Sequence, residues 1–142
     1  MTYANGNTFE GYWSDGLKSG NGTFINDNGK KFVGGYLNNL RNGFGIEYLP
    51  NGVRYEGNFK DDNKNGQGTM FWPEGNVFVG NFVDNNRTGY GTFTWVNGDV
   101  YNGGFKDNKF SDYGRFSYAN GDVYEGTWEN GEKSGMGTFR SQ

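Results

Sequence analysis

Aromatic residues and glycine recur along this chain at fixed places, with polar residues between them. From Phe9 onward an aromatic residue stands at every twenty-third position, glycine follows two places later, and a second aromatic residue follows two places after the glycine. Alternation with a period of two is typical of a β-strand with one buried face. A pattern that repeats after about 20 to 50 residues indicates a protein built from stacked structural repeats.

Each copy of the pattern has room for two strands and two turns. In the copy 55–77, rings and glycine alternate with polar residues from Tyr55 to Phe59, and a second stretch carries Gly66, Gly68, Met70 and Trp72 at alternate places. The segment 61–65 between them is rich in Asp and Asn, and Pro, Gly and Asn follow the second stretch, as expected of turns. Each copy is therefore predicted to be a β-hairpin, in which the strand glycines leave space for the large rings of the same face.

The copies together predict an all-β fold, an elongated single-layer antiparallel meander of stacked β-hairpins. An isolated hairpin is marginal in water, so each copy needs its neighbours to cover its rings. Two strands per copy at about 4.8 Å spacing predict a rod of about 60 Å for six copies. The 142 residues have room for one domain, 1–142. It holds a partial copy at 1–8 and full or nearly full copies at 9–31, 32–54, 55–77, 78–100, 101–123 and 124–142.

The phased pattern Tyr-x-Gly-x-aromatic, then Gly-x-Gly, then Asn, Asp or Glu followed by Gly, resembles the MORN repeat (membrane occupation and recognition nexus). The likeness extends from Tyr3 to Phe139, which is nearly the whole chain. It implies a twisted single-layer meander with an aromatic-lined groove, used as a scaffold or as a recognition surface.

Four residues depart from the pattern, the first being Asn26, which replaces the aromatic residue at the eighteenth place of the first copy. Glu47 stands where later copies carry phenylalanine. A local bulge that turns Glu47 outward is one interpretation, and an acid that faces a ligand is the other. In the fifth copy Asp112 replaces the first glycine of Gly-x-Gly, and Phe110 replaces a basic residue. We expect a distorted hairpin tip there, with Phe110 exposed or folded back.

Composition and charge narrow the class of protein. Hydrophobic residues make up only 32% of the chain, but aromatic residues make up 19%, so large rings can supply the core. The net charge of −3 argues against a nucleic-acid partner. The chain has no cysteine, no stretch long and apolar enough for a membrane-spanning helix, and no signal peptide at its start. We expect a cytoplasmic protein, with a membrane or cytoskeletal surface as its other candidate location.

Residues that could support catalysis or bind a cofactor are few. The chain has no histidine and no cysteine, and its acids lie mainly in turns or on the polar face. The run 61–66 copies the start of a calcium-binding EF-hand loop, but Trp72 stands where that loop needs glutamate. The Gly-x-Gly pairs lack the third glycine and the helix of a nucleotide site. We therefore predict no enzyme activity, no metal and no cofactor.

A basic residue recurs at the tenth place of five copies. One interpretation of this column is a solvated hairpin edge, and the other is contact with a phosphoinositide or another phosphate. Acids at the seventh place of the same turns cancel part of the positive electrostatic field of the column. The basic residues are Lys18, Arg41, Lys64, Arg87 and Lys133.

The rings are the remaining candidates for a binding site. A single twisted layer cannot cover both of its faces, so rows of rings should leave an apolar groove that suits a partner helix or strand. We predict that its floor consists of Phe59, Trp72, Phe82, Trp95 and Phe105.

The sequence thus predicts a non-enzymatic scaffold or recognition module that binds a protein or peptide through this groove or through open strand ends. A membrane or phosphoinositide-associated module is the first alternative, and an accessory domain of a larger enzyme or cytoskeletal protein is the second. The last strand should present an unpaired edge, which predicts end-to-end association of copies of the chain.

Overall fold

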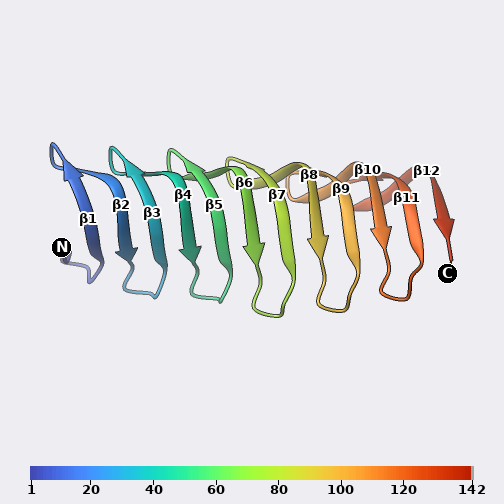
Figure 1. Cartoon of the computed structure of the whole chain (residues 1–142), viewed down its shortest axis with the longest axis horizontal. Coiled ribbons are helices and arrows are strands. Elements are labelled where there is room, and N and C mark those ends of the chain that lie inside the picture. Colours follow the sequence, from blue (N-terminus) through green and yellow to red (C-terminus); the bar gives the residue numbers. More distant parts are fainter. Residues whose placement is uncertain (142) are drawn as a thin grey trace.

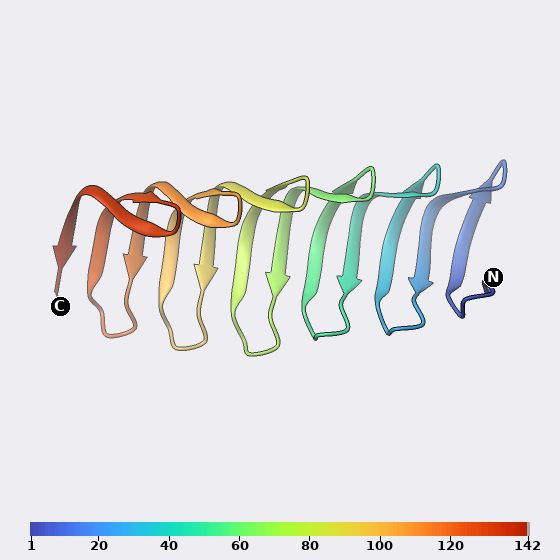
Figure 2. The same cartoon turned by 180° about the vertical axis from the view of Figure 1, so that it is seen from behind.

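The computed structural model, which describes residues 1–141, is one antiparallel sheet whose strands follow one another in chain order (Figure 1). Figure 2, the view from behind, shows the strands side by side along the molecule, with the two termini at opposite ends. The predicted all-β meander of hairpins is confirmed. Within the described residues the strands are β1 Thr8–Ser14, β2 Leu17–Ile25, β3 Lys31–Leu37, β4 Leu40–Tyr48, β5 Arg54–Lys60, β6 Asn63–Phe71, β7 Val77–Val83, β8 Asn86–Thr94, β9 Val100–Lys106, β10 Lys109–Ser117, β11 Val123–Glu129 and β12 Glu132–Arg140.

The two strands of each copy are joined by a turn of only two residues. In the third copy these are Asp61 and Asp62, whose φ angles are 48° and 75°. Two consecutive left-handed residues make the tight hairpin turn whose twist matches that of the strands, and Asp, Asn and Gly accept it best. The predicted five-residue turn 61–65 is therefore wrong, because β6 already begins at Asn63.

A bulge follows the turn in every copy and sets which residues face each other. In the third copy Gly57 lies opposite Gly68, but Phe59 lies opposite Lys64, so the second strand carries extra residues at this point. The bulge uses a left-handed residue at the twelfth place, and Asp112 takes that conformation with φ 61°. The fifth copy keeps the same register, so the predicted distortion of its tip is wrong.

Glycine pairs at the third and fourteenth places provide space for the core rings. A Cβ atom added to Gly57 would lie 2.5 Å from the Cα atom of Gly68 and 2.6 Å from the hydroxyl oxygen of Tyr55. A Cβ atom on Gly68 would meet the same Tyr55 ring. The predicted role of these glycines as packing space is confirmed.

The core is a continuous ladder of rings from the first and fifth places of the copies. Tyr55 contacts Phe59 of its own copy with ring centroids 5.2 Å apart and Phe82 of the next copy at 5.0 Å, both edge to face. Edge-to-face contacts are favoured by the charge distribution of aromatic rings. We call these rings the core ladder: Phe9, Phe32, Tyr36, Tyr55, Phe59, Phe78, Phe82, Tyr101, Phe105, Tyr124 and Trp128. Trp13 contacts Phe9 at the N-terminal end of this ladder and is 43% exposed.

Hydrogen bonds between hairpin tips tie each copy to the next. The backbone N–H of Arg41 donates to Oδ1 of Asp62 at 2.9 Å, and the backbone N–H of Asp62 donates to the carbonyl oxygen of Arg41 at 3.0 Å. Three further neighbouring copies make the same pair of bonds through asparagine. The asparagines are Asn39, Asn85 and Asn108.

Candidate functional site

A second row of rings lies beside the core ladder on the same face of the sheet and is only partly buried. These rings come from the sixteenth and eighteenth places of the third to fifth copies. Neighbouring centroids lie 4.5 to 5.2 Å apart, so the row is continuous. We call it the ring strip and define it as Trp72, Phe93, Trp95, Phe116 and Tyr118.

The predicted groove residues divide between the two rows. Trp72 and Trp95 belong to the ring strip and keep part of their surface in contact with solvent. Phe59, Phe82 and Phe105 belong to the core ladder and are at most 3% exposed. Only the two tryptophans of this group are therefore placed to contact a partner directly.

The basic residues of the tenth place lie on this inner face as well. The two-residue turn puts the tenth place opposite the fifth, so Lys64 pairs with Phe59 and shares its face. The Lys64 ammonium lies 5.4 Å from the centroid of Tyr55, and the Arg87 guanidinium lies 5.5 Å from that of Trp72. A cation at this distance from a ring is attracted to its π face. The interpretation of this column as a solvated hairpin edge is wrong, since four of its members are partly buried over rings.

In the fifth copy the tenth place carries Phe110 in place of a cation, and its ring packs against other rings. Its ring stacks on Tyr101 at 3.9 Å with an angle of 13° between the planes, and it also contacts Trp95 and Trp128. Of the two predicted positions of Phe110, exposed or folded back, the structure has the folded-back one. Its ring joins the core ladder to the ring strip.

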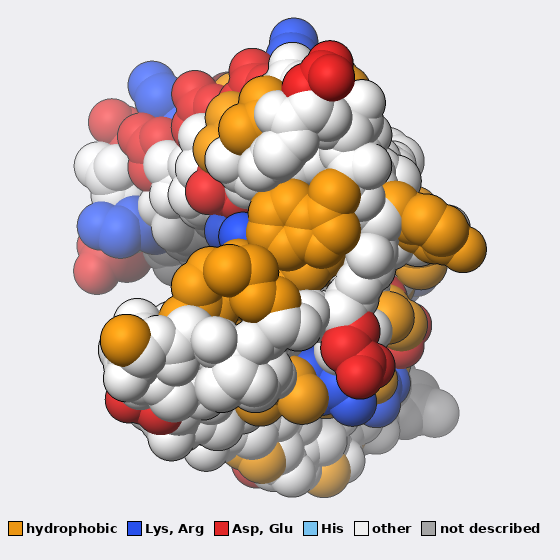
Figure 3. Space-filling model, turned by 90° about the vertical axis from the view of Figure 1, so that its left-hand side faces the viewer, with side chains coloured by type: hydrophobic (Ala, Val, Ile, Leu, Met, Phe, Trp, Pro, Cys, Tyr) orange, Lys and Arg blue, Asp and Glu red, His pale blue; other side chains and the backbone are white. Residues whose placement is uncertain are grey.

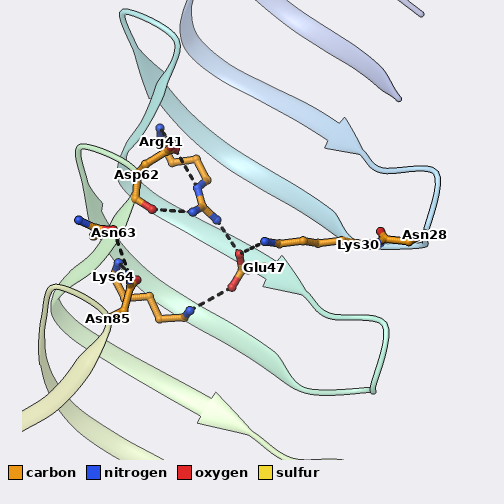
Figure 4. Close-up of polar contacts among 8 residues, drawn as sticks. All are labelled: Asn28, Lys30, Arg41, Glu47, Asp62, Asn63, Lys64 and Asn85. Atoms are coloured by element: carbon orange, nitrogen blue, oxygen red, sulfur yellow. Dashed lines mark hydrogen bonds and ion pairs between the residues drawn. The ribbon is translucent and has the colours of Figure 1, made fainter. Parts of the chain in front are cut away.

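Glu47 is buried at the centre of a cluster of cations (Figure 4). Arg41 Nη1 lies 2.5 Å from Oε2, and Lys64 Nζ lies 3.1 Å from Oε1. Lys30 Nζ, from the turn between β2 and β3, lies 3.5 Å from Oε2. Arg41 also donates through Nε to Asp62. We call these residues the Glu47 cluster.

The cluster explains why Glu47 can face inward. Burial raises the pKa of Glu47, but attraction to Lys64 and Arg41 and the hydrogen bonds from them outweigh burial and hold that pKa below its ordinary value of 4.5. The carboxylate is therefore ionised and paired. Glu47 also keeps regular register with Phe32 and Tyr55, so the predicted outward bulge is wrong.

A view of the N-terminal end of the sheet shows how hydrophobic and charged side chains are distributed around it. Figure 3 looks from the N-terminal side and shows hydrophobic side chains gathered at the centre of the face, with Lys or Arg side chains visible in the notch beside them (Figure 3). Acidic and basic side chains stand on the outer rim. In this view the hydrophobic side chains and the cations thus lie together, and acidic side chains are visible on the rim.

The six copies match the profile of a known repeat family. A profile described as the MORN repeat matches residues 9–31, 32–54, 55–77, 78–100, 101–123 and 124–142. The chain belongs to the MORN repeat family. The matched ranges agree with the six copies expected from the sequence.

Two solved structures resemble this MORN protein in fold. The SAS-4 (dCPAP) TCP domain of Drosophila melanogaster, in complex with a proline-rich motif of Ana2 (dSTIL), has a TM-score of 0.58 and 15% identity, over 99% of this chain and 82% of that one. The TCP10c domain of Drosophila melanogaster Sas-4 has a TM-score of 0.53 and 14% identity, over 99% and 90% of the two chains. At such identities the likeness concerns the fold. No curated protein sequence matches the chain significantly.

The opposite face of the MORN sheet also carries exposed rings, which the sequence reasoning did not single out. Tyr12 and Tyr90 are 71% and 68% exposed, and Phe44 is 62% exposed. They lie out of phase with the core ladder, and Tyr90 lines a shallow hollow together with Tyr113. Along residues 1–141 no helix is long and apolar enough to cross a membrane, and no three His, Cys, Asp or Glu side chains come together as metal ligands.

Proposed function

We propose that this MORN protein binds an extended segment of a protein partner along its ring strip. The observation that carries the proposal is the strip itself, a continuous row of partly exposed rings beside the core ladder. Large rings that stay partly exposed on a rigid sheet are typical anchors of protein interfaces, since they bury much apolar area with little loss of conformational freedom.

Two considerations favour an extended, proline-containing segment over a helix. Aromatic-lined grooves dock polyproline segments, which bring little conformational entropy to lose. The SAS-4 TCP domain, which shares this fold, was solved with a proline-rich motif. Arg87 lies over Trp72 and Phe93. Its Nε and Nη2 donate to Asn108, so Nη1 is the group beside the strip that can donate to the carbonyl oxygens that such a segment leaves free.

The other functions expected from the sequence stay predictions. A membrane partner would have to reach cations that lie over rings on the inner face, and a flotation assay with vesicles rich in phosphatidylserine tests it directly. Cytoplasmic location, end-to-end association and membership of a larger enzyme or cytoskeletal protein also stay untested.

Selection of peptides displayed on phage tests the proposed function. A library of random ten-residue peptides should yield binders that weaken about tenfold or more when Trp72 or Trp95 is changed to alanine. The matched controls are Tyr12→Ala and Tyr90→Ala, which remove exposed rings from the other face and should leave affinity unchanged. Binders that depend on Tyr12 or Tyr90 and not on Trp72 or Trp95 would contradict the proposal.

A further inference from the structure

A small cavity opens on the inner face where the ring strip is interrupted. In the first copy Asn26 stands at the eighteenth place, which is Trp72, Trp95 or Tyr118 in later copies. The cavity beside it has a volume of about 200 Å³. Its lining combines three rings, three cations, two amides and one carboxylate: Phe24, Phe32, Tyr36, Lys18, Lys30, Arg41, Asn26, Asn39 and Asp62. We call it the Lys18 pocket.

The cations of the Lys18 pocket are unequally engaged. Arg41 is already held by two carboxylates, those of Glu47 and Asp62. Lys30 has one contact with Glu47, at 3.5 Å. Within residues 1–141 the Lys18 ammonium makes no ion pair and lies over rings instead, 5.2 Å from the centroid of Phe9 and 5.4 Å from that of Phe24. Lys18 and Lys30 therefore remain able to hold an anion at the mouth of the pocket.

The charges and the size of the pocket select the anion. Four cations, at positions 18, 30, 41 and 64, face two carboxylates, at 47 and 62, so the local excess is positive. This excess attracts a small anion, and because the pocket lies on the same face as the ring strip, the anion that a bound partner segment can bring to it is a side-chain carboxylate. Sites for whole small molecules usually span about 300 to 1,000 Å³, so this pocket suits one side chain better than a free metabolite or a lipid headgroup.

We propose that the Lys18 pocket binds the carboxylate of an aspartate or glutamate side chain in the same partner segment that lies on the ring strip. The inference rests on the proposed function and adds a specificity element to it. One carboxylate oxygen accepts from the Lys18 ammonium and the other from Lys30, while Asn26, which is smaller than the ring at this place in the third to fifth copies, leaves room for the carboxylate.

The repeat spacing also fixes where the acid lies in the partner. From Asn26 to Trp72 the face crosses two copies, which is four strands and about 19 Å at the usual strand spacing. An extended or polyproline chain advances about 3.1 to 3.3 Å per residue. The acidic residue should therefore stand about six residues from the residue that contacts Trp72.

The first experiment tests the pocket without any partner. Backbone and side-chain NMR signals of the labelled protein are followed during titration with N-acetyl-glutamate methylamide, with its glutamine counterpart, and with inorganic phosphate. The glutamate probe should shift signals of Lys18, Asn26 and Phe24 and bind about tenfold more tightly than the glutamine probe. Lys18→Met, which keeps the aliphatic stem, should remove that preference, and the matched control Lys133→Met should keep it.

Three results of this titration would overturn the inference. They are equal shifts from the glutamate and glutamine probes, an unchanged glutamate preference in Lys18→Met, and tighter binding of phosphate than of glutamate. Thermal unfolding of Lys18→Met and of the wild type is measured as a control, to establish that the variant is folded and that a loss of binding comes from the missing ammonium.

The second experiment uses the selected peptides. An acidic residue should recur about six residues from an apolar one, and changing it to its amide should weaken binding about tenfold to the wild type but leave binding to Lys18→Met unchanged. Peptides that need Trp72 but neither Lys18 nor an acid would overturn this inference alone. Failure to select any peptide that depends on Trp72 or Trp95 would overturn the proposed function and the inference together.

Discussion

A buried carboxylate is the residue that departs most from the repeat pattern. Glu47 occupies a place that phenylalanine or methionine fills elsewhere, and its side chain is only 3% exposed. The sequence could not reveal this placement, because its partners Arg41, Lys64 and Lys30 come from three different copies or turns and meet only after the sheet has formed. Residue-by-residue comparison of copies identified Glu47 as exceptional, but of its two interpretations the outward bulge is wrong.

Replacing Glu47 with glutamine should destabilise the protein by about 2 to 4 kcal/mol. The change leaves three cations close together with no carboxylate between them, and removing one member of a buried ion pair is costly, although the partial exposure of Arg41 and Lys30 lowers the figure. Urea unfolding measures the difference. The matched control is Glu56→Gln, whose contact with Arg54 is far more exposed and should cost less than about 1 kcal/mol. Equal losses in the two variants would contradict this account.

The same residue predicts a pH dependence. Because the pKa of Glu47 is lowered on folding, its contribution to stability is present above the ordinary pKa of 4.5 and is lost as the pH falls through the lowered value. The gap in unfolding free energy between wild type and Glu47→Gln should be constant near neutral pH and should shrink below about pH 4. A gap that widens on acidification would show that the pKa shift has the opposite sign.

Glycine acts in this sheet in two separable ways. Gly57→Ala should destabilise by about 2 to 4 kcal/mol, because its Cβ atom would meet backbone at 2.5 Å and the Tyr55 hydroxyl at 2.6 Å. Gly43→Ala has open space around its Cβ atom and should cost only the strain of its left-handed φ of 83°, about 1 kcal/mol. Chemical denaturation compares the two. A loss in Gly57→Ala no larger than in Gly43→Ala would refute the packing role.

At the scale of the hairpin, one turn decides where the cations point. The alternation of rings and glycine was sufficient to predict two strands per copy and the order of the copies. Interpreting residues 61–65 as one long turn puts the basic column at a solvated edge, which is wrong because β6 begins at Asn63. Reading Asp61 and Asp62 as a two-residue turn would have paired Phe59 with Lys64 and put the cation over the rings. The signal was present in the sequence, whereas the bulge that follows depends on packing.

The hairpin tips predict a stabilising substitution. Gly131 occupies the turn position at which Asn39, Asn85 and Asn108 accept a backbone N–H of the preceding copy, and its own N–H already donates to the Phe110 carbonyl at 3.0 Å. Gly131→Asn should add a bond from the Phe110 N–H and raise stability by about 0.5 to 1 kcal/mol. Gly131→Ala keeps the backbone bond and lacks the acceptor, so it should not stabilise. A gain in the alanine variant equal to that in the asparagine variant would contradict the proposed bond.

At the scale of the whole molecule, the inner face is divided along the rod. The core ladder runs through all copies, but the third to fifth copies present rings beside it, whereas the first two present the Glu47 cluster and the Lys18 pocket. The sequence predicted the core ladder correctly, since the packing of each copy depends only on the pattern of that copy and of its neighbours. It missed the division, since that arises from single substitutions such as Asn26 and Glu47 whose spatial neighbours lie in other copies.

NMR of the tryptophan indole groups during addition of a selected peptide tests the central claim, that the inner face receives the partner. The indole N–H signals of Trp72 and Trp95 should shift with saturation at one equivalent, while the ring signals of Tyr12 and Tyr90 on the opposite face should stay in place. Shifts of Tyr12 and Tyr90 without movement of the two indoles would contradict the account.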